Sequence, residues 1–425
     1  EGGEGRLLGA LDIGASKIVC LIGRESERDE VSLLGVGAQK PQAGQDGAPQ
    51  DFDACVRAIR IAVDHAERMA GDTISAVTTA YGGPGLRSQR LSAAVAMPAG
   101  PVTAQTVRAA IAACLKTAAS ERRTVLHAIP AGYRVDGGPL LNDPRGFEGR
   151  TLSAEMILVT APEAAIAAIA DCIGEAGLRV GKVVASPYAA GLAVLSPEER
   201  AVGAMVMDCG AGHVGVAAFQ NGGLILAEQS PIGGAALSHD IANRINAPFA
   251  AAERLKVVHG GFARNAPETV EAARFGPEGR LEGFQLPRAA LTEAFAPRLE
   301  QMFNAADAKF EALARLEAER PWRLALTGGG SLMPGVKEFA QPLLHRPLRL
   351  ARPFGFGVLD ESPSAAAYAV VAGLLRYEAE HPAEALAARE AQEAPKPADR
   401  RPNVALPPDL GPKLGKAWDW LKENF

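Results

Sequence analysis

A repeat between two distant segments constrains the fold of this chain more than any other feature. Residues 8–16 read L-G-A-L-D-I-G-A-S, and residues 204–212 read A-M-V-M-D-C-G-A-G. In each copy an apolar strand ends at an aspartate, Asp12 or Asp208, and the two aspartates lie 196 positions apart. One apolar residue, a turn of small residues and a second apolar strand follow, which is the pattern of a β-hairpin. The repeat therefore predicts two related domains that face each other.

The segments around the repeat predict a mixed α/β protein. Three-stranded meanders are expected at residues 7–38 and 203–229. Apolar residues recur at helical spacing at 52–69. Helices are also expected at 162–176, with Gly177 as a plausible cap, and near 187–195. A last strand with a glycine turn is expected at 322–335. The fold class is therefore α/β, with two domains.

Composition excludes several classes of protein. The net charge of −5 gives no basic field for nucleic acid. No apolar run approaches the roughly 18 residues that a membrane-spanning helix needs. The five cysteines are scattered without metal-ligand spacing, which favours buried, reduced thiols in a cytosolic protein. The first residues are polar and form no signal peptide, so we expect any membrane contact to be made from the cytoplasmic side.

The first copy of the repeat continues into a candidate phosphate-binding turn. Backbone N–H groups of a turn built from Gly14 and Ala15 can surround a phosphate. Ser16 adds a hydroxyl group and Lys17 a positive charge, while Asp12 can hold Mg²⁺ through water. Taken alone, this pattern is more often an ordinary hairpin.

Two further motifs make nucleotide binding a stronger hypothesis. The second copy repeats the same chemistry, with Asp208 as a candidate Mg²⁺ contact through water; its turn consists of Gly210, Ala211, Gly212 and His213. Near the end of the chain, Gly328, Gly329, Gly330 and Ser331 follow a buried strand and are expected to open a helix, where glycines let a flat group approach the backbone and a helix N-terminus favours anions. The chain has neither a Walker loop nor a G-x-G-x-x-G fingerprint. Two facing turns combined with a late glycine turn indicate nucleotide binding far more specifically than any one of these motifs does.

The C-terminal segment predicts a short amphipathic helix on a flexible linker. Residues from about 381 to 412 are rich in Pro, Ala, Glu and Arg and show no apolar periodicity. On a helical projection of residues 414–425, Leu414, Trp418, Leu421 and Phe425 share one side, with Trp420 at its boundary. Such a face suits a membrane interface. Packing on the protein's own core and docking in a partner's groove are the alternatives.

In the order of these motifs the chain resembles the actin-like ATPase superfamily, and within it the FtsA family of bacterial cell-division proteins. Residues 252–256, A-E-R-L-K, resemble the helix whose glutamate and lysine, here Glu253 and Lys256, approach the ribose and adenine. Residues 126–130 (L-H-A-I-P), 143–146 (D-P-R-G) and 255–260 (L-K-V-V-H-G) resemble further family segments. The linker and the terminal helix complete the resemblance, which covers about residues 7–376 and the tip.

The resemblance implies an actin-like, ribonuclease H-like fold of two domains with an FtsA-type insertion. Its expected division is subdomain 1A at 1–75 and 162–200, 1C at 76–161, 2A at 201–235 and 301–376 with a return to 1A, 2B at 236–300, a disordered linker at 377–412 and a membrane-targeting amphipathic helix at 413–425.

The resemblance also implies a function. The expected protein binds ATP and Mg²⁺, polymerises with itself, and tethers FtsZ filaments to the inner membrane at the septum from the cytoplasmic side. Subdomain 2B would receive the acidic C-terminal peptide of FtsZ, with Arg288 and Arg298 as candidate contacts, although an intramolecular salt bridge is the alternative for Arg298. Subdomain 1C would bind later division proteins, and the terminal helix would bind membrane lipid.

Departures from the family pattern concern the second turn. Ala211 replaces a glycine, His213 replaces a threonine, and Gly215 stands where an aspartate is common. His213 could remove a hydroxyl contact or, if protonated, add a donor. We therefore expect nucleotide binding with at most weak ATPase activity. The alternatives are another bacterial actin homologue of the MreB or PilM type, and a sugar-kinase-like phosphotransferase, for which no catalytic aspartate is found.

Overall fold

The computed structural model describes residues 5–26, 31–40, 52–117, 122–263, 266–314 and 322–380. The predicted terminal helix and all but the first few residues of the predicted linker lie outside these ranges. No helix within the described part of the chain is long and apolar enough to cross a bilayer.

The first sheet contains the first copy of the repeat. Its strand order is β3-β2-β1-β4-β8, with β1 to β3 antiparallel and β4 and β8 added in parallel. The strands are β1 (Leu7–Ile13), β2 (Ile18–Glu25), β3 (Val31–Gln39), β4 (Ala76–Tyr81) and β8 (Arg179–Ala185). Helices α1 (Phe52–Ala70) and α3 (Glu163–Glu175) contact each other and the strands, while α12 (Ala369–Glu380) contacts β1, β2 and β4.

The second sheet repeats the first strand by strand. Its order is β11-β10-β9-β14-β15, again with three antiparallel strands followed by two parallel additions. The strands are β9 (Ala204–Cys209), β10 (Val214–Gln220), β11 (Gly223–Ser230), β14 (Arg323–Thr327) and β15 (Leu348–Leu350). The prediction of two related α/β domains is therefore confirmed, because both copies of the Asp-containing strand are the central first strand of an equivalent sheet.

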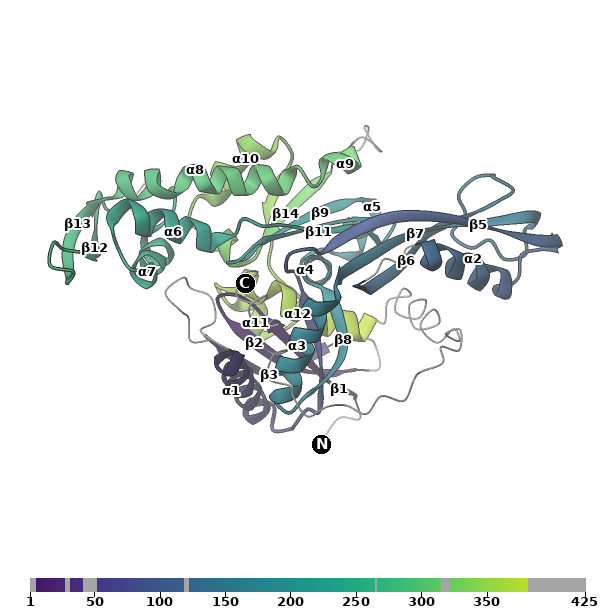
Figure 1. Ribbon diagram of the computed structural model, residues 1–425, viewed down its shortest axis with the longest axis horizontal. Coiled ribbons are helices and arrows are strands. Elements are labelled where there is room, and N and C mark those ends of the chain that lie inside the picture. The colour runs from purple at the N-terminus through teal and green to yellow at the C-terminus, as the bar shows by residue number, and fades with distance from the viewer. Residues whose placement is uncertain are drawn as a thin grey trace.

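Helix α4 (Ser186–Val194) joins the two sheets, since it contacts strands of both (Figure 1). Every one of its residues is buried. One apolar core runs from the first sheet through α4 to Val206, Ala217 and Phe219 on the inner face of the second sheet. Residues on the opposite face, such as Met205 and Met207, belong to a second core. Burial on both faces explains why β9 is apolar almost throughout.

The second core lies under helices α6 (Gly234–Ile245), α8 (Arg288–Asp307) and α10 (Val336–Leu344). Helix α7 (Phe249–His259) packs on α6, and the hairpin of β12 (Thr269–Phe275) and β13 (Leu281–Pro287) extends beyond it at one end of the molecule (Figure 1). Short helices α5 (Pro197–Val202), α9 (Glu311–Ala314) and α11 (Val358–Glu361) connect these elements.

An arm projects from the opposite end of the molecule (Figure 1). It is a three-stranded antiparallel sheet, in the order β5-β7-β6, with helix α2 packed on β5 and β7. Its elements are β5 (Arg87–Pro101), α2 (Ala104–Thr117), β6 (Arg123–Val135) and β7 (Glu148–Pro162). A separate apolar cluster that includes Cys114, Leu152 and Met156 gives this arm a core of its own.

Candidate functional site

A cavity of about 370 Å³ lies where the two hairpin turns face each other. It is lined by the turn between β1 and β2, the turn between β9 and β10, helices α6 and α7, and the glycine turn after β14. The structure thus brings together the following predicted residues: Asp12, Gly14, Ala15, Ser16, Lys17, Asp208, Gly210, Ala211, Gly212, His213, Glu253, Lys256, Gly328, Gly329 and Gly330.

The two hairpin turns are built in the same way. The Gly14 N–H donates to the Lys17 carbonyl at 3.1 Å, and the Gly210 N–H donates to the His213 carbonyl at 3.0 Å. A Cβ atom at either glycine would lie only 2.9 Å from that carbonyl oxygen, so each turn requires glycine at its first position. Because these two N–H groups close the turns, a phosphate bound here would have to contact the turn residues that follow them.

Two buried carboxylates and one lysine set the charge of the cavity. Burial raises the pKa of Asp12 to about 6, although Lys17 opposes this effect. Burial and the nearby charge of Asp12 raise the pKa of Asp208 to about 7, again against Lys17. Burial lowers the pKa of Lys17, whereas Asp12 and Asp208 raise it. The site therefore disfavours two carboxylate charges, and a bound cation would relieve that cost.

The two carboxylates suit a hard divalent cation whose remaining ligands are water or phosphate oxygens. No cluster of three or more metal-binding side chains occurs among the described residues. Mg²⁺ is commonly held by one or two carboxylates together with water and substrate phosphates. Asp12 and Asp208 fit that description, since the facing turns leave room for a phosphate chain between them.

Helices α6 and α7 supply the polar end of the cavity. Lys256 Nζ donates to Glu253 Oε2 at 2.8 Å and to the Gly234 carbonyl at 2.7 Å. Ser238 Oγ also donates to Glu253. Burial alone would raise the pKa of Glu253, but the charge of Lys256 and hydrogen bonds from Lys256 and Ser238 lower it overall. The carboxylate is thus ionised and held in place, where it can accept hydrogen bonds from hydroxyl groups.

The glycine turn packs directly on the second hairpin. Gly328 has φ of +83°, and a Cβ atom there would overlap Asp208 and the backbone of Cys209. A Cβ atom at Gly330 would lie 2.8 Å from Cys209 Cβ, whereas one at Gly329 would meet nothing closer than Ala367 Cβ at 4.0 Å. Gly328 and Gly330 are therefore needed for packing, and Gly329 faces free space.

Two sequence expectations about this turn need correction. The turn opens only a single 3₁₀ turn, η1 (Gly329–Leu332), and α10 begins later at Val336, because Gly335 adopts the left-handed region at its N-cap. Ser331 is buried and does not line the cavity: its hydroxyl donates to the Gly328 carbonyl at 2.7 Å. Ser331 holds the turn together from behind.

His213 turns its ring across the cavity toward the first domain. Its Nε2 atom lies 2.6 Å from the position that a Cβ atom would take at Gly82, and Ser186 Oγ lies 2.7 Å from the same point. Burial lowers the pKa of His213 to about 4. The ring is therefore neutral near pH 7 in the ligand-free protein, which disfavours the protonated donor that is one of the two effects expected from the sequence.

Sequence reasoning missed several residues of the site. Gly82 follows β4, Ser186 begins α4, and Leu299 and Met302 of α8 line the cavity from the apolar side. Tyr368, at the end of the 3₁₀ turn η2 (Ala365–Tyr368), lies under Lys17. The spacing of Leu299 and Met302 is that of ordinary core residues, and no local motif marks Gly82 or Tyr368, because tertiary packing alone brings them here.

The two arginines expected to contact a partner lie outside this cavity. Arg298 forms an ion pair with Asp240 of α6, with Nε to Oδ2 at 2.8 Å, and Arg298 Nη1 donates to Gln301 at 2.7 Å. This is the intramolecular salt bridge that the sequence left as an alternative. Arg288, at the start of α8, donates to the Gly261 carbonyl at 3.4 Å.

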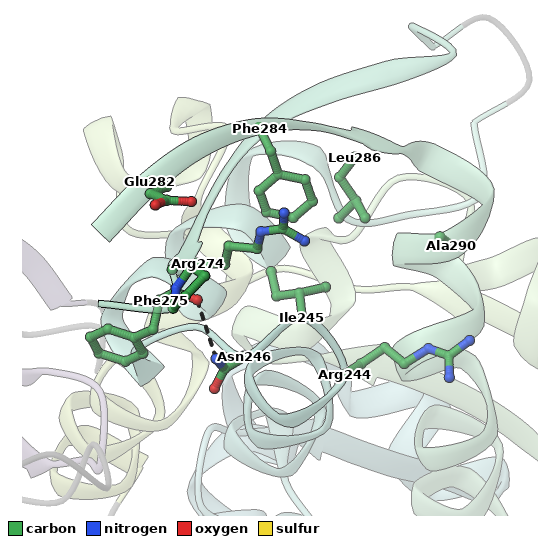
Figure 2. Close-up of a pocket in the computed structure, with 11 residues that line it drawn as sticks. Arg244, Ile245, Asn246, Arg274, Phe275, Glu282, Phe284, Leu286 and Ala290 are labelled. Atoms are coloured by element: carbon green, nitrogen blue, oxygen red, sulfur yellow. Dashed lines mark hydrogen bonds between the residues drawn. The ribbon is translucent and has the colours of Figure 1, made fainter. Parts of the chain in front are cut away.

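A second pocket of about 550 Å³ lies between the end of α6 and the β12–β13 hairpin (Figure 2). Figure 2 shows Arg244, Arg274 and Phe284 around it, and the Asn246 amide donates to the Phe275 carbonyl at 3.3 Å. The Arg274 guanidinium stacks on Phe284, with 4.8 Å between its central carbon and the ring centroid. The pocket therefore combines two cationic side chains with aromatic surface.

Comparison with protein families gives two matches. Residues 205–373 match the model of "Cell division protein FtsA", and residues 83–160 match "SHS2 domain inserted in FTSA". The second match covers most of the projecting arm.

Curated relatives match along almost the whole chain. A Rhizobium meliloti protein named cell division protein FtsA is 31% identical over 87% of this chain and 87% of its own length. Proteins of the same name from Agrobacterium fabrum and Escherichia coli K12 are 29% and 27% identical, covering 99% and 88% of this chain and 95% and 90% of their own lengths.

Solved structures show the same fold at lower identity. The PilM-PilN type IV pilus biogenesis complex contains a chain with a TM-score of 0.61 and 17% identity, which covers 87% of this chain and 97% of its own. MreB5 of Spiroplasma citri bound to ADP has a TM-score of 0.52 and 13% identity, covering 89% and 98%. The actin-like fold predicted from the sequence is therefore confirmed.

Proposed function

This chain belongs to the FtsA family of cell-division proteins, and from that premise we propose that it binds ATP with Mg²⁺ and links division filaments to the membrane. One observation supports the nucleotide part above all others. Two equivalent hairpin turns, each with a buried aspartate, face each other across a cavity that also contains Lys17 and the glycine turn. Phosphates would lie between the turns, and Asp12 and Asp208 would hold Mg²⁺ through water.

In this proposal the ribose and base lie between α7 and the glycine turn. Glu253 would accept hydrogen bonds from the ribose hydroxyls, and Lys256 would hold the Glu253 carboxylate in place. Gly329 leaves space for a flat base, while Leu299 and Met302 would bury its edge. A neutral His213 is a weak base, so we expect hydrolysis to be slow at most, with nucleotide acting mainly on conformation and self-assembly.

Filling the space at Gly329 tests the nucleotide proposal. The Cβ atom of a valine there would meet nothing closer than Ala367 Cβ at 4.0 Å, and its methyl groups would take up space in the cavity that Gly329 lines. Gly329→Val should therefore keep the fold and abolish Mg-ATP binding in isothermal titration calorimetry. Gly283→Val is the matched control, because Gly283 lies on exposed strand β13 with nothing within 4 Å of an added Cβ atom. Unchanged ATP affinity in a folded Gly329→Val protein would refute the proposal.

The remaining parts of the proposal assign surfaces to partners. The arm at 76–161 is assigned as subdomain 1C, for contacts with other division proteins, and residues 236–300 as subdomain 2B, for the acidic C-terminal peptide of FtsZ. The two domains would stack into filaments, and the segment 413–425 would bind lipid on the cytoplasmic side of the inner membrane at the septum. Many weak membrane contacts along a filament would add up to firm attachment.

The pocket beside the β12–β13 hairpin supports the choice of subdomain 2B. Arg244 and Arg274 would attract acidic residues, and Phe275 and Phe284 would receive apolar ones. Arg298 is a weaker candidate, since Asp240 already neutralises its charge.

A further inference from the structure

We propose that Tyr368 is a positioning residue for Lys17, holding the lysine ammonium where a nucleotide phosphate can reach it. The proposal rests on the nucleotide site proposed above and adds to it a residue that no phosphate motif contains. It also joins two parts of the site that lie far apart in the sequence, the first hairpin turn and the glycine turn.

The contact between the two side chains is direct. Lys17 Nζ lies 3.5 Å from the centroid of the Tyr368 ring, well inside the roughly 6 Å within which a cation is attracted to an aromatic face. Lys17 itself lines the cavity, while Tyr368 lies behind it and is partly buried against the first core. The ring therefore occupies one side of the ammonium group and leaves the cavity side to a ligand.

The backbone that carries Tyr368 is fixed to the glycine turn. The Ala366 carbonyl accepts the Gly328 N–H at 3.1 Å and the Thr327 hydroxyl at 3.4 Å. Ala367, the next residue, lines the cavity opposite Gly329. A movement of the glycine turn would therefore move the ring under Lys17, so that the base end and the phosphate end of the site are mechanically joined.

An aromatic ring suits this role better than a carboxylate would. Asp12 and Asp208 both attract Lys17, and a close ion pair with either one would neutralise the ammonium and occupy a carboxylate that Mg²⁺ needs. The face of an aromatic ring attracts a cation without carrying a net charge. Tyr368 thus holds Lys17 in place while its full charge remains available for phosphate.

Graded weakening of the ring's attraction tests the proposal without changing its shape. Phenylalanine, 4-fluorophenylalanine and 3,4,5-trifluorophenylalanine at position 368 have nearly the same size but progressively weaker attraction for a cation. Tyr368→Phe should keep Mg-ATP affinity within about threefold, and each fluorination step should reduce it, to a total of about 5- to 30-fold, the range that corresponds to one cation–π contact. Adenosine, which has no phosphate, should bind all variants equally.

A second measurement separates positioning from a structural role. In a Lys17→Ala background the fluorinated series should show one common, lower Mg-ATP affinity, because the ring no longer has a cation to hold. Equal Mg-ATP affinity along the series in the wild-type background, or a parallel loss of adenosine binding, would overturn the proposal. Failure of the unmodified protein to bind Mg-ATP would instead refute the nucleotide site itself, and this proposal with it.

Discussion

The imidazole of His213 and the backbone of Gly82 touch across the two domains: Nε2 lies 2.6 Å from the position of a Cβ atom at Gly82. His213 belongs to the β9–β10 turn of the second domain, and Gly82 follows β4 of the first. This contact is one of the places where the β9–β10 turn of the second domain meets the segment after β4 of the first. A side chain at Gly82 would have to displace both the imidazole ring and Ser186, whose Oγ lies 2.7 Å from the same Cβ position.

We predict that Gly82→Ala destabilises the folded protein by about 1–3 kcal/mol, the usual cost of overpacking an interior position. His213→Ala should cost less by itself and should lessen the cost of Gly82→Ala when the two are combined. Urea unfolding of the four proteins in this double-mutant cycle measures the coupling. Strictly additive effects would mean that the ring and the added methyl group do not compete for space.

The raised pKa of Asp208, about 7, predicts that Mg-ATP binding depends on pH. A bound cation needs the ionised carboxylate, so affinity should fall about tenfold between pH 8 and pH 6 as the group takes up a proton. The folding stability of the protein without ligand should change with pH in the opposite direction from the Mg-ATP affinity. A carboxyl group with a raised folded-state pKa contributes stability below its unfolded value of about 4 and loses it as pH rises through 7.

Asp208→Asn should therefore make the ligand-free protein more stable than the wild type at pH 8. It should also lower Mg-ATP affinity and reduce its pH dependence to the smaller change that Asp12, with a pKa of about 6, still gives. Thermal unfolding and calorimetric titration at pH 6, 7 and 8 measure both effects. Asp171→Asn, on the exposed face of α3, is the control. A variant that retains the tenfold change would show that another group titrates.

Much of the fold and the motif residues of the site could be predicted from the sequence, because both follow from local patterns along the chain. The strand before Asp12, its glycine turn and the matching segment at Asp208 obey local rules of periodicity and backbone sterics. The two sheets follow from those rules. Residues such as Gly82 and Tyr368 obey no local rule, since their role comes from segments that meet only after folding. The helix expected at the glycine run begins only at Val336, because the run forms the short η1 turn and Gly335 is the N-cap of α10.

A third prediction concerns His127, which is buried in the first core. Its Nε2 atom accepts the Ala185 N–H at 3.0 Å, and its ring meets Tyr188 edge to face with 5.0 Å between centroids. Burial lowers its pKa to about 3. The ring therefore serves as a neutral hydrogen-bond acceptor in the core.

The unfolded chain binds a proton at His127 near pH 6.5, whereas the folded chain does not. The contribution of this residue to the free energy of unfolding should therefore be fully present above pH 6.5. It should fall by up to about 1.4 kcal/mol for each pH unit below that value. His127→Gln can still accept the Ala185 N–H and should show a shallower loss between pH 6.5 and 4. His65→Gln, on the exposed side of α1, should behave like the wild type. Equal slopes for all three proteins would contradict the assignment.

A fourth prediction separates the two candidate sites for the FtsZ peptide. Arg274→Glu reverses a charge in the pocket of Figure 2 and should weaken binding of a fluorescent FtsZ C-terminal peptide at least tenfold. Arg298→Ala breaks a partly exposed ion pair with Asp240, so it should cost less than about 1 kcal/mol of stability and change peptide affinity little. The reverse outcome in fluorescence anisotropy would place the peptide on α8 instead.

The last prediction concerns the C-terminal segment, for which the sequence alone is the guide. Trp418, Leu421 and Phe425 would share the apolar face of the predicted helix, whereas Lys416 and Lys422 are offset by Asp419 and Glu423. Membrane binding should therefore depend on apolar burial, at about 1.5–3 kcal/mol for each large side chain, and little on charge. In liposome flotation, Trp418→Glu should release the protein, whereas Lys416→Gln or 0.5 M salt should not, even on anionic vesicles. Release by salt with retention of Trp418→Glu would mean that basic residues elsewhere on the chain hold the membrane.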